Sequence, residues 1–192
     1  MLPNVEPALS GGQSLRILVE DDAALLVDAT SGESAPALWG PRPAGPYSPD
    51  DAAAALAEWD RAAGGQFSVG ILEGERLLGA VGVMPDGPGS AELAYWIRPE
   101  DRGRGIATAS VRAVARWAGH SLGIARVWLE IRPGNAASLR VAERAGFRFE
   151  ARLPRHCRDW SADDAEHDSW HDCLIWIYSG DRDQATARPD GR

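Results

Sequence analysis

The chain has 192 residues, of which 44% are hydrophobic and 25% charged, a mixture that excludes a wholly disordered protein and fits one globular domain. Its formal net charge is −8, which argues against binding of duplex nucleic acid, because such binders present a basic surface. No apolar run approaches the roughly 18 residues of a membrane span, and no leader sequence opens the chain, so we expect a cytoplasmic protein without a membrane partner.

Two residue types are scarce, and their scarcity limits the chemistry. All basic residues are arginine, which excludes a lysine nucleophile or Schiff base and points to a bacterial source with GC-rich coding. The two cysteines, Cys157 and Cys173, are too few for a disulfide framework and favour a reducing compartment.

The first half of the chain combines strand patterns with strong turn signals. Five prolines between residues 31 and 49 forbid regular structure there. Glu73-Gly74-Glu75 predicts a hairpin loop, and Pro85 to Gly89 predicts a second turn. After a flexible lead-in over residues 1–14, the expected elements are a strand at 15–19, a short helix ending at residue 29, a helix at 49–63, and strands at 66–72, 76–84 and 91–97.

The second half contains the strongest helical pattern. Apolar residues from Ala107 to Leu122 recur at steps of three and four, which places them on one face of a helix over about 103–122. Further elements are expected as a strand at 127–131, a helix at 135–145 closed by Gly146, strands at 147–153 and 173–178 separated by an acidic loop, and a disordered tail over 180–192. This order predicts an α+β, or mixed α/β, fold: one domain over 15–179, with a twisted, mostly antiparallel sheet of about seven strands flanked by about four helices.

The junction between the strand at 91–97 and the long helix is the segment best suited to bind a ligand. Gly103 and Gly105 allow the backbone to approach a ligand closely, and a helix N-terminus presents unpaired N–H groups with partial positive charge. We therefore expect a main-chain site for a pyrophosphate, with Arg102 and Arg104 at its rim. A P-loop is excluded because the chain has no lysine, and the dinucleotide fingerprint lacks its third glycine.

A fuller pattern at this junction, Arg102-x-x-Gly105-x-Ala107, resembles the acetyl-CoA loop of the GNAT superfamily of N-acetyltransferases. Downstream, Asn135-Ala136-Ala137-Ser138 followed by Glu143-Arg144-Ala145-Gly146-Phe147 resembles the second cofactor-contacting motif of that superfamily. The Asn-x-x-Ser form, the strand at 91–96 and His171-Asp172 are most similar to its RimJ/RimL branch. The resemblance covers about residues 15–178 and implies a GNAT fold with acetyl-CoA as cosubstrate.

The resemblance also implies two sets of site residues. Glu92 is the leading candidate for the general base, and Glu130 on the neighbouring strand is the other. A tyrosine that serves as general acid in one branch is replaced by Ala142, so Ser138 is the candidate proton donor to the leaving thiolate. Structural alternatives remain: a glutamate could pair with an arginine, and Asn135 or Ser138 could cap a helix. The candidate cofactor-binding residues are Trp96, Ile97, Arg98, Arg102, Gly103, Arg104, Gly105, Ile106, Ala107, Thr108, Asn135 and Ser138.

The implied reaction is direct transfer of an acetyl group to a primary amine within a ternary complex. The acceptor would be a peptide or protein N-terminus or a small amine, and the acidic stretch at 154–172, unless it is only a solvated loop, would attract a cationic one. A non-catalytic acyl-CoA-binding regulatory protein of the same fold is the alternative function.

A zinc module built from Cys157, His167, His171 and Cys173 is another alternative. It lacks a close cysteine pair, so we expect no metal. The residues identify neither the acceptor nor the oligomeric state, which is a monomer or a homodimer.

Overall fold

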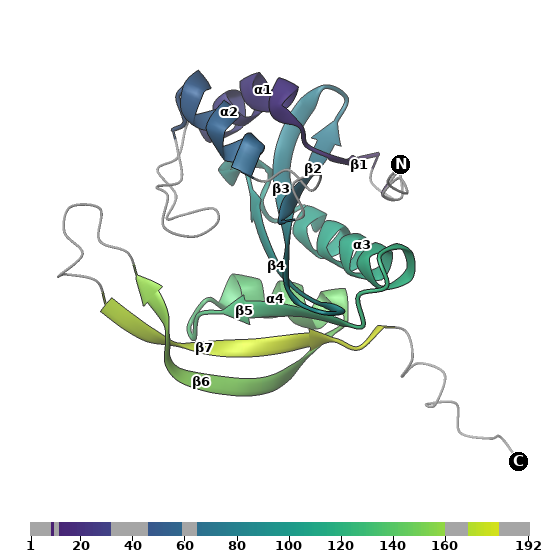
Figure 1. The fold of residues 1–192 in the computed structure, drawn as a ribbon, viewed down its shortest axis with the longest axis vertical. Helices are drawn as coiled ribbons and strands as arrows, with labels where there is room; N and C mark the ends of the chain where they lie inside the picture. The colour runs from purple at the N-terminus through teal and green to yellow at the C-terminus, as the bar shows by residue number, and fades with distance from the viewer. Residues whose placement is uncertain (1–8, 10–11, 32–45, 59–64, 160–168, 181–192) are drawn as a thin grey trace, which may run out of the picture.

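The structure is a computed structural model that describes residues 9, 12–31, 46–58, 65–159 and 169–180. Within these residues seven strands form one sheet in the order β1-β2-β3-β4-β5-β7-β6 (Figure 1). All neighbouring pairs are antiparallel except β4 and β5, so the predicted mostly antiparallel sheet is confirmed. The strands are β1 (Ser14–Ile17), β2 (Phe67–Glu73), β3 (Arg76–Gly87), β4 (Ser90–Ile97), β5 (Arg126–Ile131), β6 (Phe147–Asp159) and β7 (Ser169–Tyr178).

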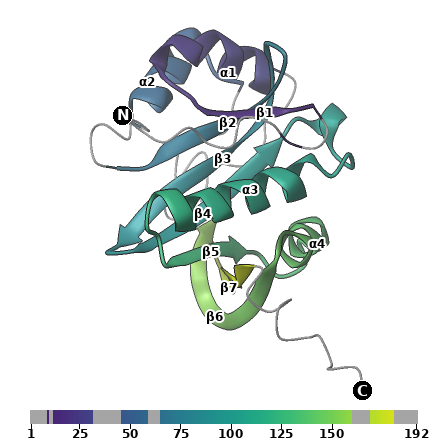
Figure 2. The ribbon, with the colours of Figure 1, turned by 90° about the vertical axis from the view of Figure 1, so that its right-hand side faces the viewer.

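Helices cover both faces of this sheet. In the described part of the chain the α-helices are α1 (Ala23–Thr30), α2 (Pro49–Glu58), α3 (Ile106–Ser121) and α4 (Ala136–Ala145). The larger buried apolar cluster joins the sheet to α3 and α4, and the smaller one joins it to α1 and α2. Figure 2 shows β2 and β3 between the α1–α2 pair and α3.

The alternation of side chains along β4 and β5 determines which groups reach which face. Ala91 and Leu93 in β4, and Leu129 in β5, are buried in the cluster beneath α3 and α4. Because successive residues of a strand point to opposite faces, Glu92 and Glu130 lie on the other face of the sheet.

Two glycines shape the helices that border this region. Gly105 precedes α3 with a φ of 79°, and Gly146 ends α4 with a φ of 94°. Both values lie in the left-handed region that glycine adopts without steric cost. The Gly146 N–H donates to the carbonyls of Ala142 and Glu143, which closes α4 as the sequence predicts.

Two predicted loops are wrong in part, because strands continue into them. β3 runs through Gly87 instead of ending at Met84, with a register shift between Pro85 and Gly87 that accommodates the proline.

In the acidic loop expected over 154–172, the described parts, 154–159 and 169–172, extend β6 and β7 as a hairpin, in which Cys157 pairs with His171 after an irregularity that begins at Leu153. Residues 160–168 of that loop lie outside the described residues. Arg155 has a φ of 49° within this irregularity. Bulges of this kind let a strand continue past a proline such as Pro154.

Several predictions fall on residues outside the described part of the chain. They concern most of the lead-in, the proline-rich segment, the end of the helix expected at 49–63, and nearly all of the tail.

Candidate active site

The parallel pair β4 and β5 is joined along only part of its length. Their pairing runs from Ser90 opposite Arg126 to Leu93 opposite Leu129. Beyond Leu93, β4 continues against β3, and β5 continues against β7. The two strands therefore diverge (Figure 1), and the facing edge of β4 is left available to an extended ligand.

A cavity of about 630 Å³ opens at this divergence. It is bordered by the end of β4, the loop that follows, the first turn of α3 and one face of α4. Most of the candidate cofactor residues meet there: Trp96, Ile97, Arg102, Gly103, Gly105, Ile106, Ala107, Thr108, Asn135 and Ser138. The two motifs, some 30 positions apart in the sequence, thus form one site.

The loop before α3 presents main-chain N–H groups at the mouth of this cavity. Among the described residues, no recorded hydrogen bond uses the N–H groups of residues 103–108. Gly103 and Gly105 both have positive φ, and a Cβ at either position would meet no atom within 4 Å. Unpaired N–H groups at the N-terminus of a 16-residue helix make a site for an anion.

Two of the predicted cofactor arginines direct their side chains elsewhere. The Arg98 guanidinium is buried and pairs with Asp28 in α1. The Arg104 guanidinium donates to Asp101 at 2.5 Å and to Glu73 at 2.9 Å. Neither residue lines the cavity, so the charge expected from Arg104 at its rim is already compensated by carboxylates.

Two other arginines, Arg140 and Arg144 on α4, do line the cavity and were missed. Their spacing from Ala137 follows one helix face. This spacing would have indicated Arg140 and Arg144 as cavity residues once the second motif had been placed on a helix. Arg102, in contrast, lines the cavity as predicted, and its Nε donates to the carbonyl of Ile97 at 3.0 Å.

Two hydroxyl-bearing side chains from different elements, Tyr95 and Ser138, line the cavity. Ser138 lies beside Tyr95 of β4, whose hydroxyl is shielded from solvent. Burial raises the pKa of Tyr95, although the Ser138 hydroxyl opposes that rise, so Tyr95 stays protonated at neutral pH. Tyr95 could not be recognised as a site residue from the sequence, because its position beside Ser138 depends on how α4 packs on the sheet.

Asn135 caps α4, which was the structural alternative to its predicted role in cofactor binding. Its side-chain oxygen accepts the N–H of Ser138 at 3.1 Å. This bond fixes the first turn of α4, and with it the position of Ser138 in the cavity.

A carboxylate cluster occupies the opposite face of the sheet. Burial raises the pKa of Glu92 to about 8, with smaller contributions from the negative charges of Glu130 and Asp86. Asp86 accepts a hydrogen bond from the indole Nε1 of Trp128 at 3.0 Å. A carboxyl with such a pKa takes up and releases a proton near neutral pH, which is what a general base requires.

Glu130 lies among groups from β6 and β7. Its Oε1 is 2.8 Å from Cys157 Sγ and 3.6 Å from His156 Nε2. Burial raises the pKa of Glu130, and the positive potential of His156 and His171 opposes that effect. The two candidate bases therefore have different surroundings, since no cation contributes to the pKa of Glu92.

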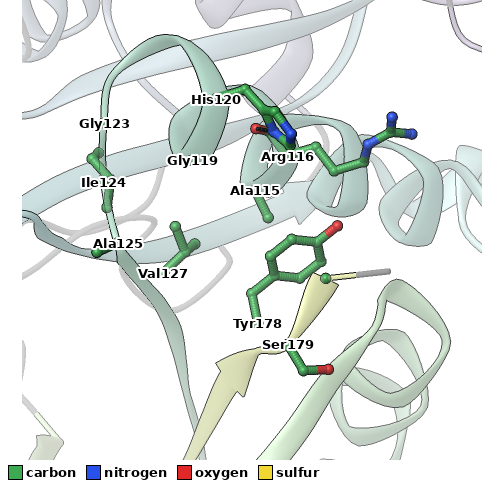
Figure 3. A pocket seen from close by; sticks show the side chains of 11 residues that line it. Ala115, Arg116, Gly119, His120, Gly123, Ile124, Ala125, Val127, Tyr178 and Ser179 are labelled. Carbon is green, nitrogen blue, oxygen red and sulfur yellow. Dashed lines mark hydrogen bonds between the residues drawn. The ribbon is translucent and has the colours of Figure 1, made fainter. Parts of the chain in front are cut away.

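A second cavity, of about 760 Å³, lies at the other end of α3 (Figure 3). It is larger, but it contains neither motif. Small residues and main chain form much of its wall, with Tyr178 on one side and the exposed Arg116 and His120 on another. Since it lacks both a helix N-terminus and a buried acid or base, the cavity at the strand divergence is the candidate active site.

Comparison with known proteins agrees with this geometry. Residues 14–148 match the acetyltransferase (GNAT) domain, so the chain belongs to the GNAT acetyltransferase family. The predicted GNAT membership and fold are confirmed. Within the described residues, no helix has the length and apolar character needed to cross a membrane.

Individual relatives extend this comparison. A probable N-acetyltransferase of Bacillus subtilis, YjcK, is 33% identical over 87 residues, which are 44% of this chain. The aligned stretch spans 48% of that protein, about half its length.

Among solved structures, the ribosomal-protein-S5-alanine acetyltransferase from Vibrio fischeri is similar with a TM-score of 0.72 and 16% identity, over 88% of this chain and 94% of that one. RimJ from Mycobacterium smegmatis, in complex with CoA-disulfide, has a TM-score of 0.71 and 21% identity, over 92% and 89% of the two chains. At these identities the similarity is one of fold.

Proposed function

We propose that this protein transfers the acetyl group of acetyl-CoA directly to a primary amine bound on the opposite face of the sheet. One observation carries the proposal: β4 and β5 diverge beyond Leu93 beside a cavity that holds unpaired N–H groups and hydroxyls, and Glu92, in the last paired residues before the divergence, lies on the opposite face of the sheet. A group lying between the strands is thus accessible to an acid from one side and a base from the other.

The donor would lie along the cavity. The diphosphate of acetyl-CoA would accept hydrogen bonds from the N–H groups of residues 103–108, with positive charge from Arg102, Arg140 and Arg144 nearby. The pantetheine arm would add to the free edge of β4 as an extended strand does. GNAT enzymes as a family use acetyl-CoA, and the RimJ structure holds a CoA derivative.

An ammonium acceptor loses two protons in the transfer, one before the attack and one as the amide forms, and the leaving thiolate takes up one. Glu92 would accept a proton from the ammonium group of the acceptor, directly or through a water molecule, so that the amine nitrogen attacks the thioester carbonyl carbon. Main-chain N–H groups near Ile97 would stabilise the tetrahedral oxyanion. As the C–S bond breaks, the nitrogen releases its second proton to the Ser138 hydroxyl oxygen, and that hydroxyl, which Tyr95 adjoins, passes its own proton to the departing CoA thiolate.

The acceptor side favours a cationic amine. Glu130 and Asp86 contribute negative potential there, which attracts an ammonium group. Asp172, from the stretch first expected to supply this attraction, is instead held by Arg152 at 2.6 Å and by the N–H of Arg155 at 3.0 Å. The acceptor class proposed is therefore a peptide or protein N-terminus or a small amine, as in the relative that acetylates a ribosomal-protein alanine.

An amine panel with a thiol readout tests this function. Purified protein, acetyl-CoA and a set of primary amines that includes peptides beginning with alanine or serine are followed by release of free CoA. We expect amine-dependent release by the wild type and a loss of roughly 100-fold or more in Glu92→Gln. Tight acetyl-CoA binding without release for any amine would instead favour the non-catalytic acyl-CoA-binding protein.

A further inference from the structure

The structure brings together a group of metal-ligating side chains that the proposed acyl transfer does not use. Cys157 in β6, with His171 and Cys173 in β7, place one ligand atom each within 4.8 Å of one another. We propose that these three residues, in the reduced protein, bind a zinc ion next to the acceptor face of the sheet. The proposal is independent of acetyl transfer.

The register of the strands explains why these three residues meet. Cys157 pairs directly with His171 across the β6–β7 ladder, and Leu153 pairs with Cys173. The irregularity between Leu153 and Cys157 shifts Cys157 so that it faces both positions in β7. Since residues two apart in a strand share a face, His171 and Cys173 lie on one side. The sequence alone does not reveal this cluster, because the two cysteines are far apart in the chain. They meet only because the register shift in β6 brings Cys157 opposite His171.

The donor set fits zinc. Two thiolates and one imidazole are ligands of the kind found in tetrahedral zinc sites, with Zn–S near 2.3 Å and Zn–N near 2.1 Å. Ligand atoms of such a site lie roughly 3.5 Å apart, which is compatible with the spread of these three. Cys173 is fully buried and Cys157 is partly buried, so solvent would have little access to the sulfur ligands.

The structure joins Cys157 and Cys173 as a disulfide, with Cα atoms 6.0 Å apart. That separation suits a disulfide and equally suits two ligands of one metal ion. The two states exclude each other, because a disulfide has no thiolate to donate. A dithiol reagent supplies the two electrons and two protons that convert the disulfide to two thiols, and zinc binding then releases both thiol protons.

Glu130 favours the reduced, metal-binding state. Its Oε1 lies 2.8 Å from Cys157 Sγ, and a disulfide sulfur has no proton to donate to a carboxylate. In the reduced protein the Cys157 thiol donates this hydrogen bond. Three protein ligands leave the fourth coordination position of zinc to water or another ligand, and Glu130 adjoins the cluster through its contact with Cys157. His167, the fourth residue of the zinc alternative, lies outside the described residues.

The test is made on the full chain, reduced with a dithiol reagent and desalted under nitrogen. Zinc is added, the excess is removed, and the metal content is measured by mass spectrometry. Cobalt(II) serves as the spectroscopic probe, because a tetrahedral site with thiolate ligands gives sulfur-to-cobalt charge-transfer bands. We expect about one metal ion per chain and these bands in the wild type.

Single substitutions assign the ligands. Cys157→Ser and His171→Asn should each weaken zinc binding by at least roughly tenfold in competition with a chelating dye, whereas His120→Asn, at an exposed position on α3, should bind as the wild type does. Circular dichroism checks that each variant is folded. Reduced wild-type protein that binds neither zinc nor cobalt while both thiols remain titratable would overturn the proposal. So would a disulfide, seen as a mass about two daltons lower, that persists in protein taken anaerobically from a reducing cytoplasm.

Discussion

The Glu92→Gln substitution should stabilise the protein while it lowers turnover roughly 100-fold or more. Burial and two neighbouring acids raise the pKa of Glu92 from an ordinary 4.5 to about 8, so the folded protein holds this proton at pH 7 and the unfolded chain releases it. Between pH 4.5 and pH 7 lie about 2.5 pH units, each worth about 1.36 kcal/mol. The wild type is therefore less stable at pH 7, by on the order of 3 kcal/mol, than a variant that cannot ionise there.

The pH dependence of this difference has a definite sign. Below pH 4.5 both folded and unfolded wild type are protonated at Glu92, so wild type and variant should be nearly equal in stability. The stability of the wild type relative to the variant should then fall as pH rises from 4.5 to about 8, and should change no further above that value, where both states are ionised.

Urea unfolding at about pH 5, pH 7 and pH 8.5 measures this difference. At pH 7 the variant should also melt roughly 6–12 °C higher than the wild type. Glu150→Gln is the matched control, because Arg126 lowers the pKa of this exposed carboxyl, and the substitution should bring no stabilisation. An equal difference between wild type and Glu92→Gln at all pH values would refute the claim that the fold holds Glu92 protonated.

Three further predictions concern the proposed reaction. In calorimetry, Gly105→Asp should weaken acetyl-CoA binding at least tenfold more than Gly105→Asn. Both variants require the same positive φ at residue 105, but only the aspartate carboxylate repels the diphosphate. Equal affinities of the two variants would refute the anion site. The value of kcat/KM should rise about tenfold per pH unit up to about pH 8 and then level off, and a flat wild-type profile would exclude Glu92 as the base. If Tyr95 acts through the neighbouring Ser138, Tyr95→Phe should lower kcat roughly tenfold in the wild type but little in Ser138→Ala. Independent, additive losses in steady-state assays would contradict that coupling.

Local sequence signals were sufficient for the elements that form the cofactor side. Gly103 and Gly105, the apolar periodicity of α3 and the Asn135 cap each act within a few residues of chain. Backbone conformation and capping are local properties, so the helix N-terminus and its unpaired N–H groups could be predicted before their surroundings were known.

Features that depend on strand register could not be predicted in this way. The Arg98 side chain pairs with Asp28, and the Arg104 side chain pairs with Glu73. Both carboxylates come from elements distant in the sequence. The extension of β6 and β7 depends on an irregularity next to Pro154 that brings Cys157 opposite His171. Across this irregularity β6 advances four residues while β7 advances two, and the two extra residues change which groups meet.

The most direct test of the account is a crystal structure of the protein with bound CoA. The account predicts that diphosphate oxygens lie within about 3.2 Å of main-chain nitrogens among residues 103–108, with the thiol directed between β4 and β5 towards Ser138. A diphosphate bound away from these nitrogens, for example in the cavity beside His120 and Tyr178, would contradict it.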